Sequence, residues 1–374
     1  MRDGKTMKIA HFGSYGINIG DNIALYNVRK GIEMAYKKPI TWTPVSILDF
    51  HNVRNNIKYS TERFKKISGE NDLLVIGGGG LIEGGVYNEG FDTGYKLPFA
   101  PETLDGLTIP VVGFSVGINH FRGIPKLNAR GIDAVDSLID KSALFSVRND
   151  GSKEILTEAI DNATAVEEIP DPGLMYLTPA KDKVTLNHFA RGLFQPAWNG
   201  DSRLLWGRFG KGENVSYISA FIRQQGCAVI PHTPKDYDWT NVGLDKSAWV
   251  VSKENFMKQA NLDNVMEFLK LYYDYDYVIA MRGHGQLISI GANIPSLYLS
   301  TQDKVSDFSR KNGFSDYNID LEDPRWLEQL RSCSNKLVHD PNYLATWYEI
   351  RNSKMAEYKK SYENFCNKVA QCCG

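Results

Sequence analysis

The chain has 374 residues, with 43 Lys and Arg against 44 Asp and Glu and a formal net charge of −1. At about 150 residues per domain, this length predicts two domains. The balanced charge excludes the strongly basic surface by which proteins bind DNA or RNA without sequence preference. Hydrophobic residues make up 42% and charged residues 23%, which is a globular composition and excludes general disorder.

No stretch approaches the roughly 20 consecutive apolar residues that a transmembrane helix needs. Residues 1–7 lead into the first apolar run without a hydrophobic signal core, so we expect a cytoplasmic protein. The five cysteines are odd in number and contain no Cys-x-x-Cys pair. We therefore expect reduced thiols and no zinc site.

In the first half of the chain, short apolar runs alternate with amphipathic stretches, which is the pattern of an open parallel sheet covered by helices. A strand is predicted over 8–12. A helix follows, in which four apolar residues share one face: Leu25, Val28, Ile32 and Ala35. Continuous apolar runs predict three further buried strands, at 72–76, 110–116 and 143–147.

The pattern breaks near residues 176–186 and then restarts. Strands are predicted at 227–230, 277–280 and 295–299, and helices at 213–225, 264–271 and 286–292. Residues 341–371 keep a nearly helical stripe of aromatic and apolar residues. We therefore expect an α/β domain over 7–178, a second over 182–335, and a C-terminal helix over 340–374 that packs back on the first domain.

In open α/β sheets, ligands bind outside the carboxyl ends of the strands, so the turns after the strands are the candidate site. After the first strand, Asn18 and Asp21 either cap the next helix or bind ligand hydroxyls. The turn with Gly78, Gly79 and Gly80 lets backbone pass close to a ligand, with a flexible surface turn as the alternative. It is not a P-loop, because no Gly-Lys-Ser/Thr follows.

Cationic side chains lie at or just after the carboxyl ends of other predicted strands. Arg148 ends an apolar strand and can clamp a carboxylate or phosphate with paired donors, or form a surface ion pair. His232 follows a strand of the second half. Arg282 and His284 leave another strand together, with a glycine after each, and a helix begins at once. The amino-terminal N–H groups of that helix would add donors for an anion.

Taken in order, these motifs resemble those of the polysaccharide pyruvyl transferase family. The resemblance runs from residue 8 to the region of Gly313, and it rests on order and spacing more than on any single motif. The matching residues are Asn18-Ile-Gly-Asp21, Val75-Ile-Gly-Gly-Gly-Gly80, Pro110-Val-Val-Gly-Phe-Ser-Val-Gly117, Ser146-Val-Arg-Asn-Asp150, Asp171-Pro172, Arg282-Gly-His284, Ala292-Asn-Ile-Pro295, Lys304, Phe308 and Gly313.

The resemblance implies an α/β fold of the GT-B glycosyltransferase type, with two Rossmann-like domains facing across a cleft. It implies phosphoenolpyruvate as donor substrate and a sugar or polysaccharide as acceptor, which can be lipid-linked. The product would be a pyruvate ketal on two sugar hydroxyls. A protein of this family would work in the cytoplasm, peripheral to the membrane where glycans are assembled. The resemblance does not decide whether the chain forms a homo-oligomer.

The resemblance also assigns residues. Arg148, Arg282 and His284 take the catalytic positions of the family. The family often has Arg-Asp where this chain has Arg148-Asn149, with Asp150 one place later. No cofactor and no metal is required by the expected reaction, and no His/Cys/Asp cluster has ligand spacing.

The chemistry of phosphoenolpyruvate suggests roles for these side chains. The two arginines suit its carboxylate and its phosphate. Protonation of the methylene carbon and deprotonation of the sugar need a group that titrates near neutral pH. His284 is the first candidate for this work and His232 the second. Asn18 and Asp21, on the opposite domain, would hold the acceptor hydroxyls, and Gly78–Gly80 would bind substrate.

Two other readings stay open. A GT-B-type glycosyltransferase with a nucleotide-sugar donor fits the glycine turns equally well. A non-catalytic sugar-binding or sensory protein is the second alternative, although the retained arginines and histidine argue against it. Trp198, Trp206 and Trp239 either stack on sugars or pack a domain interface. The stretch 188–212 is a candidate for acceptor recognition.

Overall fold

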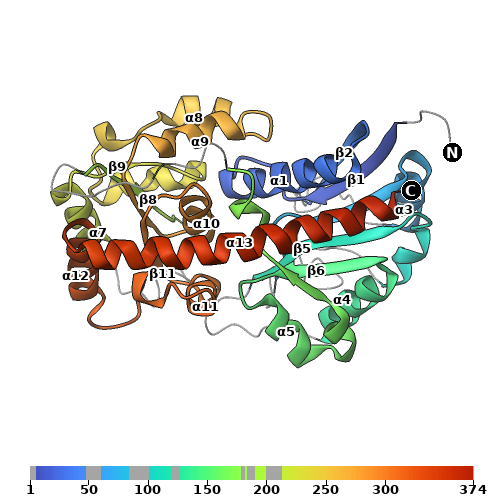
Figure 1. The fold of residues 1–374 in the computed structure, drawn as a ribbon. Helices are drawn as coiled ribbons and strands as arrows, with labels where there is room; N and C mark the ends of the chain where they lie inside the picture. The colour runs from blue at the N-terminus through green and yellow to red at the C-terminus, as the bar shows by residue number, and fades with distance from the viewer. Residues whose placement is uncertain are drawn as a thin grey trace. The chain divides into compact units, whose positions relative to one another are not determined.

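The computed structural model describes residues 6–47, 60–83, 101–119, 127, 129–177, 182, 190–198 and 213–373. The chain divides into two compact units, and both are built from pieces that are discontinuous in sequence (Figure 1). Unit 1 takes its residues from Met1–Gly16, Ala24–Pro172 and Glu357–Gly374. Unit 2 takes its residues from Ile17–Ile23 and Gly173–Ala356.

Unit 1 is built on one parallel sheet with the strand order β2-β1-β3-β5-β6-β7, and β4 pairs with β5. The strands are β1 Met7–Gly13, β2 Ile40–Ser46, β3 Leu73–Gly77, β4 Gly80–Glu83, β5 Val111–Asn119, β6 Leu144–Arg148 and β7 Glu167–Ile169. All nine residues of β5 are buried. This explains its continuous apolar run, because a central strand of a parallel sheet is covered on both faces.

Four helices and two short 3₁₀ turns belong to the described part of unit 1, besides the end of the C-terminal helix. They are α1 Ile19–Tyr36, α3 Thr61–Glu70, α4 Ala129–Lys141 and α5 Ser152–Ala159, with turns at Pro101–Gly106 and Asp161–Ala165; a further turn, Pro172–Leu174, spans the limit between the two units. The first residues of α1 group with unit 2. Phe64 of α3, Leu138 of α4 and Leu156 of α5 are buried in one hydrophobic core together with apolar side chains of the central strands.

Unit 2 contains a second parallel sheet, with the order β12-β11-β10-β8-β9. Its strands are β8 Gly192–Gln195, β9 Ala228–Val229, β10 Tyr277–Ala280, β11 Ser296–Ser300 and β12 Asn318–Asp320. Its helices are α7 Glu213–Gln224, α8 Lys253–Gln259, α9 Val265–Tyr273, α10 Gly283–Gly291, α11 Asp303–Lys311 and α12 Trp326–His339, with 3₁₀ turns at Pro234–Val242, Lys246–Ala248 and Ser315–Tyr317.

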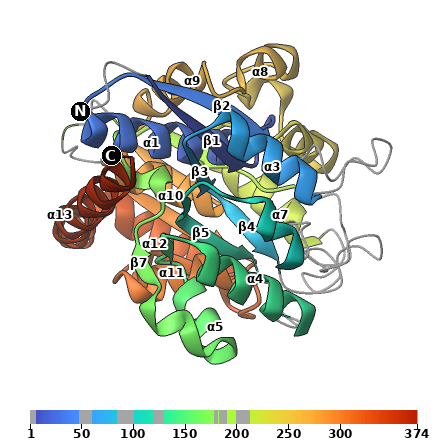
Figure 2. The same cartoon turned by 90° about the vertical axis from the view of Figure 1, so that its right-hand side faces the viewer.

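A helix of 32 residues, α13 Pro341–Cys372, supplies side chains to both units. In unit 2, Arg351 donates to the carbonyl oxygen of Ile290 at 3.0 Å. In unit 1, α13 lies beside α1 (Figure 2), and the Tyr362 hydroxyl donates to the carbonyl oxygen of Asn27 at 2.9 Å. Only the part of the helix from Glu357 onward therefore packs on the first unit, where the whole of 340–374 had been expected to do so.

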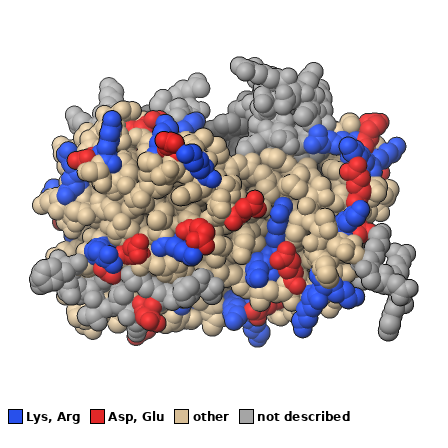
Figure 3. All heavy atoms as spheres, turned by 90° about the horizontal axis from the view of Figure 1, so that it is seen from above, with Lys and Arg blue, Asp and Glu red and all other residues tan. Residues whose placement is uncertain are grey.

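The charged side chains are mixed in sign. On the face drawn in Figure 3, Lys and Arg atoms lie interspersed with Asp and Glu atoms. Several are close pairs on one helix, such as Lys258 with Glu254 at 2.7 Å. None of the described helices is both long and apolar enough to cross a membrane.

Candidate active site

The candidate site of unit 2 lies where three neighbouring strands end. Because β9, β8 and β10 are adjacent and parallel, their carboxyl ends share one edge of the sheet. Trp198 follows β8, His232 follows β9, and Arg282 follows β10. The sheet order thus brings together residues that are more than 80 positions apart, at the edge where open α/β sheets bind ligands.

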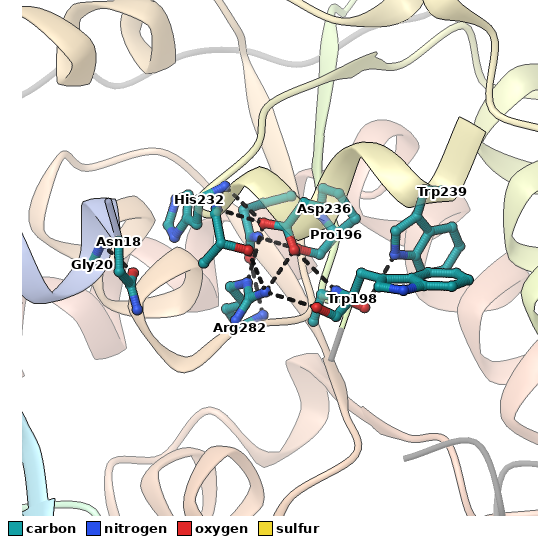
Figure 4. Close-up of polar contacts among 11 residues, drawn as sticks. Asn18, Gly20, Pro196, Trp198, His232, Asp236, Trp239 and Arg282 are labelled. Carbon is teal, nitrogen blue, oxygen red and sulfur yellow. Dashed lines mark hydrogen bonds and ion pairs between the residues drawn. The ribbon is translucent and has the colours of Figure 1, made fainter. Parts of the chain in front are cut away.

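A buried carboxylate, Asp236, ties these three segments together (Figure 4). Its Oδ1 accepts from the backbone N–H of Trp198 at 3.0 Å, and its Oδ2 accepts from the backbone N–H groups of His232 and Thr233 at 2.8 and 2.9 Å. Thr233 and Asp236 also form the capping box of the 3₁₀ turn Pro234–Val242. One carboxylate therefore fixes the ends of two strands at once.

The same carboxylate holds the Arg282 guanidinium with two further bonds. Nη2 of Arg282 donates to Oδ1 of Asp236 at 2.6 Å, and Nε donates to Oδ2 at 3.3 Å. Nη2 also donates to the Thr233 hydroxyl at 3.1 Å. The Arg282 side chain is 19% exposed. Within the described chain Nη1 has no partner, so the two N–H groups of this nitrogen are left to bind a ligand.

The backbone of Arg282 is fixed by Gln195, which is fully buried at the end of β8. Its side-chain oxygen accepts from the backbone N–H of Arg282 at 3.0 Å, and its amide donates to the carbonyl oxygen of Pro196. The helix α10 starts directly afterwards. Among the described residues, a Cβ at Gly283 would meet nothing within 4 Å, so there is open space beside the first residue of α10.

His232 is a neutral imidazole. Its Nε2 forms a hydrogen bond of 2.6 Å with the Tyr272 hydroxyl. Complete burial, together with the nearby Arg282 and His284, lowers the pKa of His232 well below its ordinary value of 6.5. Its Nδ1 is buried and has no hydrogen-bond partner among the residues that the structure describes. At neutral pH this side chain therefore carries no charge, and it cannot serve as a protonated acid.

His284 lies in the first turn of α10 and packs against the start of α1. A Cβ on Gly20 would overlap its imidazole ring, so glycine is required at that position for the ring to fit. The backbone N–H of Ile19 donates to the carbonyl oxygen of His232 at 3.0 Å. Asn18 caps α1, with its Oδ1 accepting from the N–H of Gly20 at 3.0 Å.

The structure thus brings five predicted residues together in unit 2: Asn18, Asp21, His232, Arg282 and His284. Asn18 and Asp21 had been expected on the opposite domain from Arg282. They group with it because the start of α1 contacts the turns after β9 and β10. The backbone N–H of Ile19 donates to His232, and Gly20, which has no side chain, lets the ring of His284 pack against it. Asp21 lies in the first turn of α1 and is half-buried.

Arg148 belongs to unit 1 and is engaged inside the protein. It is 4% exposed, and its Nη1 and Nη2 lie 2.9 Å from carboxylate oxygens of Asp171 and Asp150. A Cβ on Gly117 would overlap its guanidinium. Asp150 therefore acts as the carboxylate partner although it comes one place later than in the family pattern. This pairing favours a structural role over the predicted clamp on a substrate.

The glycine turn is also in unit 1, and its close approaches are to protein backbone. Gly78 has a φ of 80°, and a Cβ there would lie 3.3 Å from the backbone of Ala24 in α1. The N–H of Gly117 donates to the carbonyl oxygen of Gly79 at 2.9 Å. The amide of Asn119 donates to the carbonyl oxygen of Gly80 at 2.9 Å. Packing against α1 and β5 thus accounts for the glycines at 78 and 80, where a Cβ would meet the backbone of Ala24 and the side chain of Asn119.

The sequence reasoning missed Asp236, Gln195 and Tyr272. Asp236 had a usable signal, because Thr233-Pro-Lys-Asp236 has the spacing of a capping box at a helix start. Gln195 and Tyr272 carried none, since the role of Gln195 depends on which strands are neighbours and that of Tyr272 on the packing of α9 beside His232. Trp239 is fully buried and donates to the carbonyl oxygen of Ala197 at 3.1 Å, so it packs the protein.

Two further predictions concern the stretch 188–212 and the binding of metal. Trp206 and most of the stretch 188–212 lie outside the described residues. Among the residues that the structure describes, no group of three or more His, Cys, Asp or Glu side chains could hold a metal ion.

Known structures with a similar fold include enzymes that act on a nucleotide sugar. A UDP-GlcNAc 2-epimerase from Neisseria meningitidis, bound to UDP-GlcNAc, has a TM-score of 0.52 at 10% identity and covers 98% of this chain and 99% of its own. A UDP co-structure of MnaA from S. aureus has a TM-score of 0.50 at 10% identity, with 91% and 90% covered. At such identity the likeness shows the fold alone, and it confirms the predicted α/β fold of the GT-B type.

No curated protein matches this chain in sequence. The profile of the polysaccharide pyruvyl transferase family matches residues 18–303. This match runs from the cap of α1 to the first residue of α11 and includes Asp236, Arg282 and His284. Because it covers most of the chain, the protein belongs to the polysaccharide pyruvyl transferase family.

Proposed function

We propose that this protein transfers the pyruvyl unit of phosphoenolpyruvate to two hydroxyls of a sugar in a glycan, forming a cyclic ketal and releasing phosphate. The observation that carries the proposal is the arrangement around Arg282. Its guanidinium is held on one edge by buried Asp236, keeps Nη1 unpartnered in the described chain, and precedes the first turn of α10. Family membership supplies the reaction class.

Donor binding follows from this geometry. Phosphoenolpyruvate carries a phosphate and a carboxylate, and both are planar or trigonal arrays of oxygen acceptors. The two N–H groups of Nη1 of Arg282, fixed in the guanidinium plane, are the donors offered to one of them. The first N–H groups of α10 lack partners within the helix and carry its positive dipole end. They face open space at Gly283 and suit the same anionic substrate.

The proton inventory favours His284 as the acid. A proton added to the methylene carbon of phosphoenolpyruvate leaves a cation at C2, which one sugar hydroxyl attacks with loss of its own proton. Departure of phosphate regenerates an oxygen-stabilised cation at C2, and the second hydroxyl closes the ring as it loses its proton. His232 is held neutral by burial, so it fits the role of a base or of an orienting group. His284 therefore remains the candidate that both gives and takes a proton.

Acceptor binding is proposed for the start of α1. Asn18 uses its side-chain oxygen to cap the helix, so its amide N–H groups are the part that would contact a sugar hydroxyl. Asp21 adds a carboxylate acceptor one turn further on. Both belong to the same unit as Arg282 and His284.

The test is incubation of the protein with phosphoenolpyruvate and a panel of glycans, with phosphate release and the mass gain of a pyruvate ketal as readouts. Arg282→Lys should lower kcat/KM for phosphoenolpyruvate roughly 10- to 100-fold, because a single ammonium cannot keep the two bonds to Asp236 and also present the Nη1 donors to the substrate. The matched control is Arg310→Lys, at a 68% exposed side chain paired with Asp307. Equal activity of the two variants would contradict the assignment of Arg282.

A nucleotide-sugar glycosyltransferase is the second candidate, favoured by the nucleotide-sugar enzymes that share the fold. In that case Arg282 and the first turn of α10 would hold a diphosphate. The same incubation separates the two functions. Consumption of a UDP-sugar with phosphoenolpyruvate untouched would establish the second candidate, and phosphate release from phosphoenolpyruvate would exclude it.

A further inference from the structure

A cation of unit 1 lies between two aromatic rings and is not used by the site described above. The guanidinium carbon of Arg29, on α1, lies 5.4 Å from the ring centroid of Tyr15 and 5.2 Å from that of Trp42 on β2. Nε of Arg29 donates to Nδ1 of His11 at 3.3 Å, and Nη2 donates to the Tyr15 hydroxyl at 2.7 Å. We call Tyr15, Arg29, Trp42 and His11 the Arg29 cluster.

No carboxylate of the described chain forms an ion pair with Arg29. The acidic residue one turn along α1, Glu33, accepts from the indole N–H of Trp42 at 2.8 Å instead. A guanidinium has five N–H donors, and His11 and Tyr15 use two of those of Arg29. Among the described residues, both N–H groups of Nη1 and one of Nη2 remain without an acceptor. Within this part of the chain, Arg29 is thus a half-buried cation with free donors and no counter-charge, which is an incomplete ion pair.

His11 cannot neutralise or share this charge. It is fully buried, and burial together with the adjacent Arg29 lowers its pKa to about 3. The neutral ring accepts from Arg29 at Nδ1, so its proton is on Nε2, which lies 3.4 Å from the carbonyl oxygen of Gly77. Burial raises the pKa of Tyr15 to about 12. Its phenol thus stays protonated and keeps an O–H to donate.

The position of the cluster fits a ligand site. Tyr15 follows the carboxyl end of β1, and Gly77 ends β3, the strand beside it in the sheet. β2 is the edge strand on the other side of β1 (Figure 2). The carboxyl ends of parallel strands are where this class of sheet binds ligands. In such a cluster the aromatic rings offer apolar faces to a sugar ring, and the cation offers hydrogen-bond donors to the charged group of that sugar.

We propose that the Arg29 cluster binds the anionic group, carboxylate or phosphate, of a sugar in the acceptor glycan. The remaining N–H donors of Arg29 and the Tyr15 hydroxyl hold the anion, and the rings of Tyr15 and Trp42 contact the sugar. This rests on the proposed function only in naming the ligand as the acceptor. The site would make the protein select glycans with acidic or phosphorylated sugars over neutral ones.

The experiment is equilibrium binding without phosphoenolpyruvate, by calorimetry, of three probes: glucuronate, glucose phosphate and uncharged glucose. The wild-type protein should bind at least one charged probe in preference to glucose, and the stronger of the two identifies the anion. Arg29→Gln should weaken that binding roughly 10- to 100-fold, since hydrogen bonds to charged groups carry most of it. The control Lys30→Gln removes the same charge from the next, exposed position of α1 and should change nothing.

Three results would overturn the inference. They are no preference for either charged probe, equal binding by wild type and Arg29→Gln, and a loss of phosphoenolpyruvate binding in Arg29→Gln as large as the loss for the charged sugar. The last would make the cluster a donor site. Arg29→Lys keeps the charge beside the rings and serves as a second variant if Arg29→Gln does not fold. Because binding is measured without turnover, failure of the pyruvyl transfer assay leaves this test intact.

Discussion

Replacing Asp236 with asparagine tests whether one carboxylate assembles the site of unit 2. Oδ1 of Asp236 accepts from two donors and Oδ2 from three. An amide placed there points its NH₂ group at two or more N–H donors in either orientation. The side chain is 0% exposed, so no water replaces the lost acceptor, and the Arg282 cation loses its counter-charge.

The size of the effect follows from burial. Removing one partner of a buried ion pair costs about 3–5 kcal/mol. Because the Arg282 side chain is 19% exposed, solvent screens part of the lost attraction. We therefore expect the free energy of unfolding to fall by about 3 kcal/mol, a large part of the 5–15 kcal/mol that stabilises a typical domain. At roughly 2–4 °C per kcal/mol for a unit of this size, Asp236→Asn should lower Tm by about 6–12 °C.

Thermal unfolding followed by calorimetry measures this shift. Asp307→Asn is the matched control, because Asp307 pairs with Arg310 on one exposed helix face and should change stability by about 0.5 kcal/mol or less. In the activity assay Asp236→Asn should also raise KM for phosphoenolpyruvate, because Arg282 is no longer aligned. A variant that melts like Asp307→Asn and keeps the wild-type KM would refute the view that Asp236 positions Arg282.

Two further predictions concern unit 1. Arg148→Met should destabilise the protein by about 3–5 kcal/mol in urea unfolding, because it leaves the carboxylates of Asp150 and Asp171 buried without their cation; a variant of normal stability that has lost only activity would return Arg148 to the substrate site. His11→Gln should flatten the acid side of the stability curve. The folded state holds the pKa of His11 at about 3 against an ordinary 6.5, so the unfolded chain binds the extra proton and stability falls as pH drops below 6.5, by up to about 1.4 kcal/mol per pH unit. Urea unfolding at a series of pH values gives the free energy of unfolding as a function of pH. Below pH 6.5 its slope should correspond to one proton fewer taken up on unfolding in the variant than in the wild type, and an unchanged slope would argue against a neutral His11.

Most central strands could be predicted from the sequence because they are buried on both faces. The run 277–280 coincides with β10, and 72–76 differs from β3 by one residue at each end. β2 was missed, since an edge strand with an exposed face and Pro44 has no continuous apolar run. β8 was missed as well, because Gly192–Gln195 is too short to stand out.

The site was predictable only where chemistry and local turn coincide. Arg282 and His284 were found because a strand, two glycines and a helix start follow one another within a few residues. Asp236 depends on β9, β8 and β10 being neighbours, which a strand pattern alone does not determine. The expected boundary at 176–186 differs from the observed unit limits for the same reason. Residues 17–23 join unit 2 through contacts with His232 and His284 that are far away in sequence.

The end of α13 has a consequence for how this protein is made on the ribosome. Tyr362 and Phe365 are almost fully buried in unit 1, and both rings pack edge-on against Phe114 in the central strand β5. During synthesis those two rings are added more than 240 residues after Phe114. Unit 1 therefore cannot complete its core before the end of α13 has been synthesised, whereas all segments of unit 2 precede residue 357. Until then the hydrophobic surface of β5 lacks the two rings that cover it and needs protection.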